Sequence, residues 1–154
     1  MMPIPEGDHT WSVRVRWHDA AGARVYARTQ SFEVGSQASI RESDPRPSAL
    51  EYLLGALAGD LACGLQREAS ARSLAIHSLE VAMSGRLQNV LVHFGVIGEE
   101  GHPGLEAVTG TVYVGTDADA PALEDAWRAA LARSPLFTTL SRCAPVSVAL
   151  RMMP

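Results

Sequence analysis

The chain has 154 residues, of which 47% are hydrophobic and 19% are charged, and its formal net charge is −4. We expect one domain over residues 1–154, since this length and composition support a single hydrophobic core. The negative charge disfavours a nucleic-acid partner, which would require a basic patch, and no apolar run reaches the ~18 residues of a membrane span. Because residues 1–7 also lack the apolar segment of a secretory signal, we expect a cytoplasmic protein without a membrane partner.

The first predicted elements form a β-hairpin. Residues 10–19 alternate strictly between apolar and polar types and predict a half-buried antiparallel strand. Its apolar side carries Trp11, Val13, Val15 and Trp17. Residues 20–23 predict a turn, and residues 24–34 predict the returning strand. Residues 35–47 are polar, contain two prolines and predict a loop.

The longest helical pattern in the chain covers residues 48–70. Leucines recur in it at three- and four-residue spacing and form one apolar face, namely Leu50, Leu53, Leu54, Leu57, Leu61 and Leu65. Ser48 and Glu51 have the spacing of a capping box at its start. Gly55, Gly59 and Gly64 each cost about 1 kcal/mol relative to alanine, so another backbone is expected to pass close by. At ~35 Å, this helix is long enough to be the central buried helix of a small domain.

The next part of the chain predicts one strand and a less regular segment. Residues 74–87 alternate again and predict a strand with one irregularity near His77. Residues 89–97 are apolar and fit either a strand or an irregular segment. Residues 98–104 contain three glycines and a proline, and predict a loop.

The last third predicts a strand, two helices and a final strand. Residues 105–114 are rich in β-branched types and predict a strand. Pro121 suits the first turn of an amphipathic helix over residues 122–133. A Ser-Pro pair ends that helix and starts a short helical piece that runs to residue 140, and residues 146–152 predict the last strand.

Asp60 interrupts the apolar pattern of the central helix. Aspartate is rarely buried without a partner, so two interpretations stand. Asp60 is either a partly solvated residue at the edge of the helix or a functional-site carboxylate that acts as a ligand group or a general base. In the second case it needs an arginine, a hydroxyl or a backbone N–H as its partner. We predict that Asp60 is the centre of whatever site this protein has.

The sequence predicts neither a metal nor another cofactor. Its five histidines lack the short His-x-x-x-His spacing typical of zinc sites. P-loop, dinucleotide-binding and nucleophile-elbow motifs do not occur. Both cysteines are expected to be free thiols. Cys63 lies among apolar residues of the central helix, so we expect it to be buried and unreactive.

Three segments resemble the OsmC/Ohr family. Residues 48–65, SALEYLLGALAGDLACGL, are similar to its central helix. Residues 98–114, GEEGHPGLEAVTGTVYV, are similar to its middle strand and the loop before it, and residues 134–150, SPLFTTLSRCAPVSVAL, to its second site. The resemblance implies an α+β fold with two antiparallel sheets around a long central helix. It also implies an intertwined homodimer with a site at the interface and a role in oxidative or osmotic stress.

The family's thiol peroxidase chemistry uses two cysteines, and this sequence departs from the family at both positions. Aligned on the shared motifs, Asp60 stands at the first cysteine position and Ala144 at the second. Cys63 lies three residues after the first position, and Cys143 lies one residue before the second. The resemblance also implies an assisting glutamate, whose position is next to Glu51.

Three functions therefore stay open. The first is a non-thiol protein in which Asp60, with Glu51 as a further ligand candidate, binds or processes a small molecule in an interface pocket. The second is an organic hydroperoxide reductase with Cys63 as the peroxidatic thiol and Cys143 as the resolving thiol. A shift of three residues moves a side chain ~4.5 Å along a helix. This is more than the ~3.5 Å within which reacting atoms must lie, so we rank the hydroperoxide reductase second. The third is a binding module without catalysis.

Overall fold

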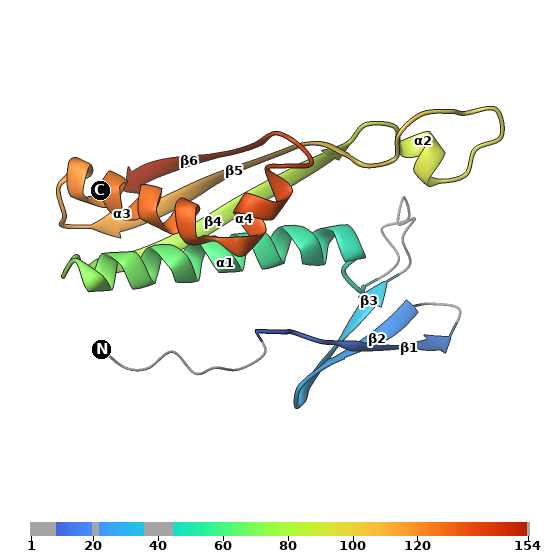
Figure 1. The fold of residues 1–154 in the computed structure, drawn as a ribbon, viewed down its shortest axis with the longest axis horizontal. Coiled ribbons are helices and arrows are strands. Elements are labelled where there is room, and N and C mark those ends of the chain that lie inside the picture. The colour runs from blue at the N-terminus through green and yellow to red at the C-terminus, as the bar shows by residue number, and fades with distance from the viewer. Residues whose placement is uncertain (1–8, 20–21, 36–44, 154) are drawn as a thin grey trace. The chain divides into compact units, whose positions relative to one another are not determined.

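The structure, a computed structural model, describes residues 9–19, 22–35 and 45–153 (Figure 1). These residues form six strands and four helices in the order β1–β2–β3–α1–β4–α2–β5–α3–α4–β6. The chain divides into two compact units, Met1–Ala49 and Leu50–Pro154. Each unit has a three-stranded sheet of its own.

The sheet of the first unit is antiparallel. Its strands are β1 (Arg14–Asp19), β2 (Gly22–Ala27) and β3 (Gln30–Gly35), hydrogen-bonded in that order. The single strand predicted over residues 24–34 is wrong, because Arg28 and Thr29 turn the chain between Ala27 and Gln30. Arg28 has a φ of 55°, a left-handed conformation that is common in such tight turns and is usually signalled by glycine or asparagine.

Two predicted connections of the first unit fall mainly outside the described part. Residues 20–21 belong to the predicted turn and residues 36–44 to the predicted loop, and both stretches lie outside the described residues.

One face of the first sheet is apolar and largely exposed. Val15, Val25 and Phe32 are cross-strand neighbours on this face. Val25 is buried, but Trp11 is 88% exposed and Trp17 is 74% exposed. The first predicted strand, residues 10–19, is confirmed over residues 14–19, and Trp11 lies before it. Its predicted half-burial is wrong, because the side chains of Val15 and Trp17 are exposed.

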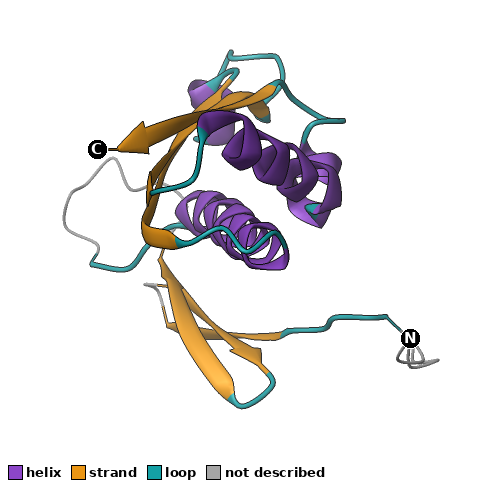
Figure 2. Ribbon diagram, turned by 90° about the vertical axis from the view of Figure 1, so that its left-hand side faces the viewer, coloured by secondary structure: helices purple, strands orange, loops and turns teal. Residues whose placement is uncertain are grey.

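The second unit packs helices against one face of its sheet (Figure 2). Its elements are α1 (Ala49–Ala71), β4 (Ile76–Leu87), α2 (Val90–His93), β5 (Leu105–Thr116), α3 (Ala120–Arg133), α4 (Pro135–Leu140) and β6 (Val146–Met153). Strands β4 and β5 pair antiparallel, whereas β6 runs parallel to β5. This sheet is therefore mixed and not antiparallel as the resemblance implies, because a crossover through α3 and α4 returns the chain in the same direction.

The hydrophobic core of the second unit lies between α1, α3 and the inner face of the sheet. Its buried members are Leu57, Leu61 and Leu65 of α1, Val108, Val112 and Val114 of β5, and Leu123, Ala126, Trp127 and Ala130 of α3. The helix predicted over residues 48–70 is confirmed as α1, and its leucine face is the buried face.

The glycines of α1 differ in their surroundings. A Cβ on Gly64 would lie 3.7 Å from the Cβ of Ala130, so α3 does pass close to this glycine, as the sequence predicts. A Cβ on Gly55 or Gly59 would meet no atom of the described residues within 4 Å. The close neighbour predicted for Gly55 and Gly59 is therefore not found within this chain.

Two local irregularities flank strand β4. The irregularity predicted near His77 is confirmed, because the β4–β5 register shifts between Ile76 and Ser78. The ambiguous segment at residues 89–97 contains the short helix α2. Asn89 caps it, since its Oδ1 accepts hydrogen bonds from two backbone N–H groups of the first turn.

Within the described part of the chain, we find no helix with both the length and the apolar character that crossing a bilayer requires.

Candidate functional site

Asp60 has the two kinds of partner that a half-buried carboxylate on α1 requires. The Oγ of Ser134 donates a hydrogen bond of 2.6 Å to its Oδ2. The backbone N–H of Leu136 is directed at the same oxygen, at 3.3 Å. The predicted need for a hydroxyl or a backbone N–H is therefore met. Among the described residues, no hydrogen bond reaches Oδ1, which leaves one oxygen of the carboxylate open.

Ser134 connects this carboxylate to the junction between α3 and α4. It is the last residue before α4, it is only 4% exposed, and its Oγ accepts a hydrogen bond of 2.9 Å from the N–H of Phe137. The same hydroxyl therefore caps α4 and donates to Asp60. Pro135 occupies the first turn, where a missing N–H costs no hydrogen bond. The Ser-Pro pair thus places the start of α4 against the middle of α1.

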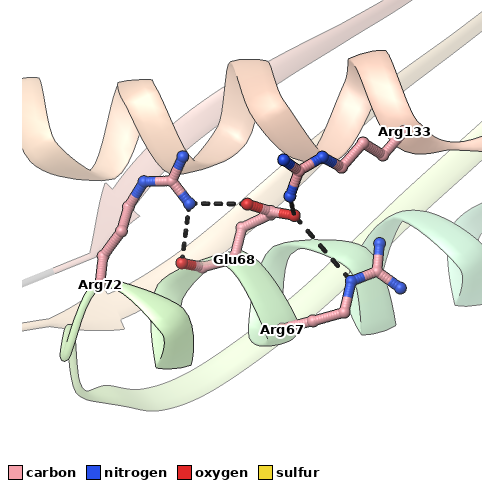
Figure 3. Close-up of polar contacts among 4 residues, drawn as sticks. All are labelled: Arg67, Glu68, Arg72 and Arg133. Atoms are coloured by element: carbon pink, nitrogen blue, oxygen red, sulfur yellow. Dashed lines mark hydrogen bonds and ion pairs between the residues drawn. The ribbon is translucent and has the colours of Figure 1, made fainter. Parts of the chain in front are cut away.

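A second carboxylate, further along α1, joins this helix to α3. Glu68 is only 2% exposed, and its side chain lies between α1 and α3 (Figure 3). The Nη1 of Arg72 is 2.6 Å from its Oε2, and the Nη1 of Arg133 is 2.5 Å from its Oε1. These hydrogen bonds, that of Arg72 foremost, hold the pKa of the Glu68 carboxyl below its ordinary value, against the opposing effect of burial.

Arg133 and Ser134 are consecutive residues, so both carboxylates hold the same point of the chain. Arg133 pairs with Glu68 and Ser134 donates to Asp60, eight residues earlier on α1. Two charged groups of one helix thereby fix the end of α3 and the start of α4. The geometry around Asp60 consequently rests on a framework that is itself buried and paired.

The two cysteines are free and exposed. The expected burial of Cys63 is wrong. Two residues along a helix correspond to a rotation of about 200°, which turns Cys63 away from the buried side chain of Leu61. Cys143 lies in the connection between α4 and β6, with its Sγ 3.8 Å from the carbonyl oxygen of Thr139.

Glu51 does not join Asp60 within this chain. It lies in the first turn of α1 and is exposed. Nine residues separate it from Asp60, a rise of about 13.5 Å along a helix. The predicted ligand pair of Glu51 and Asp60 therefore is not assembled by a single α1 helix.

The second unit also has a hollow that is separate from these residues. It has a volume of about 690 Å³ and is lined by Ser78, Leu79, Glu80, Ala82, Tyr113 and Met153. Glu80 and Tyr113 are cross-strand partners, and the next pair along the strands is Val81 with the buried Val112. Successive residues of a strand point to opposite faces, so Glu80 and Tyr113 point away from the core. The hollow therefore lies on the face of the sheet that points away from the core, and none of the predicted site residues lines it.

Sequence reasoning missed the roles of Ser134, Glu68 and Arg133. A signal for Glu68 was present, because it follows Leu61 by seven residues and Leu65 by three, and so falls on the buried leucine face. A charged residue at such a position requires a charged partner. Tertiary packing determines which residues supply that partner, so the spacing along the chain does not identify them.

Comparisons with known proteins agree with this fold. An OsmC-like protein structure from Mycoplasma pneumoniae is 13% identical to this chain, with a TM-score of 0.81 over 96% of this chain and 100% of that chain. An organic hydroperoxide resistance protein, OsmC, from Legionella pneumophila is 9% identical, with a TM-score of 0.68 over 94% of this chain and 99% of that chain.

A further similar structure is the organic hydroperoxide resistance protein OhrB of Bacillus subtilis, which is 13% identical, with a TM-score of 0.62 over 92% of this chain and 98% of that chain. No curated protein sequence matches the chain. The model of the family described as OsmC-like protein matches residues 41–149. The α+β fold and this match together place the chain in the OsmC-like protein family.

Proposed function

We propose that this chain is a non-thiol OsmC-like protein that binds or processes a small molecule at a site centred on Asp60. The observation that carries the proposal is the geometry of its carboxylate. Ser134 and the N–H of Leu136 both donate to Oδ2, while Oδ1 accepts no hydrogen bond from the described residues. An oriented carboxylate with one open oxygen can bind a hydroxyl or a cationic group, or can take up a proton as a general base.

The proposed working form is a homodimer. Two surfaces of the chain support this form. The first is the apolar face of the β1–β2–β3 sheet, on which Trp17 is 74% exposed. The second is the side of α1 that carries Gly55 and Gly59, which the described residues leave uncovered. Exposed aromatic residues and helix faces of small residues are both suited to contact with a second copy of the chain.

The proposed site is tested by a ligand screen on matched variants. Small hydroxylated and cationic molecules are added to the wild type, to Asp60→Asn and to Glu124→Gln, and the melting temperature is measured. A ligand that binds only the folded state raises this temperature according to its concentration and Kd. We expect compounds that stabilise the wild type and Glu124→Gln but not Asp60→Asn. The exposed Glu124 of α3 serves as the control for loss of one negative charge.

The second candidate is the hydroperoxide reductase that uses Cys63 and Cys143. One observation favours it: both thiols are free and exposed, so a peroxide could reach them. In this reaction a thiolate attacks the peroxide O–O bond, an alcohol leaves, and the second thiol then displaces water to give a disulfide. The names of the similar Legionella and Bacillus proteins refer to hydroperoxide resistance. The displacement of Cys63 from the expected nucleophile position keeps this candidate second.

A further inference from the structure

Three arginines surround the buried carboxylate of Glu68. The closest contacts of that carboxylate are with Arg133 at 2.5 Å and Arg72 at 2.6 Å, and the Nε of Arg67 is 3.9 Å from Oε1 (Figure 3). Arg67 and Arg72 belong to the end of α1 and the turn that follows it, whereas Arg133 ends α3. Two helices thus place three guanidinium groups around this carboxylate, with Arg72 and Arg67 on opposite sides of it (Figure 3). We call these three residues the arginine cluster.

The charge of the arginine cluster is not balanced by Glu68. Three guanidinium groups and one carboxylate leave an excess of two positive charges. Other pairs, such as Arg24–Glu33 and Arg86–Glu106, join one arginine to one carboxylate. The excess is also unusual for a chain whose formal net charge is −4. The cluster is therefore a local positive site on an acidic protein.

The guanidinium groups of the arginine cluster keep donors available to solvent. The side chains of Arg133 and Arg67 are 66% and 63% exposed, and that of Arg72 is 36% exposed. Arg133 and Arg72 both reach Glu68 through Nη1, and among the described residues their Nε and Nη2 groups have no acceptor. Parallel N–H groups of this kind match the oxygens of phosphate and carboxylate.

The buried Glu68 also holds two members of the arginine cluster, Arg72 and Arg133, in place. A buried carboxylate with two short charge-assisted hydrogen bonds restrains the side chains of Arg72 and Arg133 before any ligand arrives. Less side-chain freedom is then lost on binding, which favours affinity. We propose that Arg67, Arg72 and Arg133 form a binding site for a phosphate-type oxyanion, either inorganic phosphate or the phosphate group of a larger molecule.

This proposal is tested by titrating the protein with inorganic phosphate at constant ionic strength, with chloride as the balancing ion. The arginine Nε–H resonances are followed by NMR, and a second titration uses phenyl phosphate as a phosphate monoester. We expect saturable shifts for Arg67, Arg72 and Arg133. Equal affinities for the two probes indicate a site for free phosphate, whereas tighter binding of the monoester indicates the phosphate group of a larger molecule.

Substitutions test whether the arginine cluster binds the phosphate. Arg133→Gln and Arg67→Gln should each weaken phosphate binding by about tenfold, the loss expected for one charge-assisted contact. Arg67→Gln is the safer of the two for folding, because its contact with Glu68 is the longest. Arg128→Gln, an exposed arginine of α3 that pairs with Asp125, should bind as the wild type does. The proposal is overturned if no saturable shift occurs, if chloride alone reproduces it, or if Arg67→Gln and Arg128→Gln respond alike.

Discussion

The hydroxyl of Ser134 donates to Asp60 at 2.6 Å and, at the same time, accepts from the N–H of Phe137 at 2.9 Å. One oxygen atom therefore both caps α4 and orients the carboxylate on α1. Any change at this hydroxyl affects the start of one helix and a half-buried charge of another. The stability of the α3–α4 junction and the geometry of the candidate site are thus linked through a single side chain.

Ser134→Ala should destabilise the protein by about 1–3 kcal/mol, since it removes a helix cap and takes a hydrogen bond from a half-buried carboxylate. Urea unfolding followed by circular dichroism measures the loss. Ser141→Ala is the matched control, because Ser141 is an exposed serine at the other end of α4. Equal losses for the two variants would show that the link between Ser134 and Asp60 contributes nothing measurable.

The contribution of Glu68 to the free energy of unfolding should decrease as the pH becomes acidic. Hydrogen bonds from Arg72 and Arg133 lower its pKa in the folded protein, so its stabilising effect is complete above the ordinary glutamate pKa of about 4.3. That effect is lost as the pH falls below this value and through the lower folded pKa. The difference in unfolding free energy between the wild type and Glu68→Gln should therefore be largest near neutral pH and should shrink as the pH is lowered from about 5 to 3.

Urea unfolding at several pH values between 7 and 3 measures this difference. Glu106→Gln provides the comparison, since Glu106 pairs with the exposed Arg86 and its own side chain is about half exposed. Its stability difference from the wild type should be small at every pH. A constant difference for Glu68→Gln over the whole range would contradict the assignment of the buried ion pairs.

Gly59→Leu should separate the proposed homodimer into monomers without unfolding them. Within the chain, a Cβ at this position meets no described atom within 4 Å, and leucine favours a helix more than glycine by up to about 1 kcal/mol. At an interface between two α1 helices, however, a leucine would overpack the contact. Sedimentation velocity on the wild type and the variant tests the prediction.

Gly64→Leu is the contrasting variant. An added Cβ on Gly64 would lie 3.7 Å from the Cβ of Ala130, so the longer leucine side chain should destabilise the fold of the second unit itself. A wild-type protein that sediments as a monomer at all usable concentrations would remove the basis for the dimer proposal.

Cys143 is exposed and should react readily with a disulfide reagent in the native protein, whereas Cys63, which lies one helical turn from Gly59 on the same side of α1, should be covered by the second copy in the proposed homodimer. Organic hydroperoxides should nevertheless consume them slowly, since Asp60 occupies the position that the family resemblance assigns to the nucleophile. Thiol titration before and after addition of a hydroperoxide makes the comparison. Rapid loss of two thiols per chain, with an intramolecular disulfide detected by mass, would instead favour the peroxidase.

Much of the second unit was predictable from the sequence because its local patterns are strong. Leucine spacing gave α1 and its buried face, and Pro121 marked the first turn of α3. The parallel direction of β6 is a property of the crossover, which local patterns do not encode. The turn at Arg28 is a local feature, but it was missed because its left-handed residue is an arginine and not the glycine or asparagine that usually signals such a turn.

The candidate site was predictable only in part. Asp60 stood out as a charge in an apolar helix, and the types of its partners followed from the cost of burying it. Ser134 lies 74 residues further along the chain, so no spacing argument could identify it. The exposure of Cys63 could have been derived from its angle to Leu61 on α1, but the apolar character of its neighbours in sequence suggested burial instead.

If Asp60 is the centre of a small-molecule site, chemical-shift mapping should locate the ligand beside it. A stabilising compound from the ligand screen is titrated into ¹⁵N-labelled wild type and into Asp60→Asn, whose asparagine can still accept from Ser134. We expect shifts concentrated at the amides of Asp60, Ser134 and Leu136 in the wild type, and no binding by Asp60→Asn, whose fold should be the same. Shifts confined to other parts of the chain, or equal binding by Asp60→Asn, would contradict it.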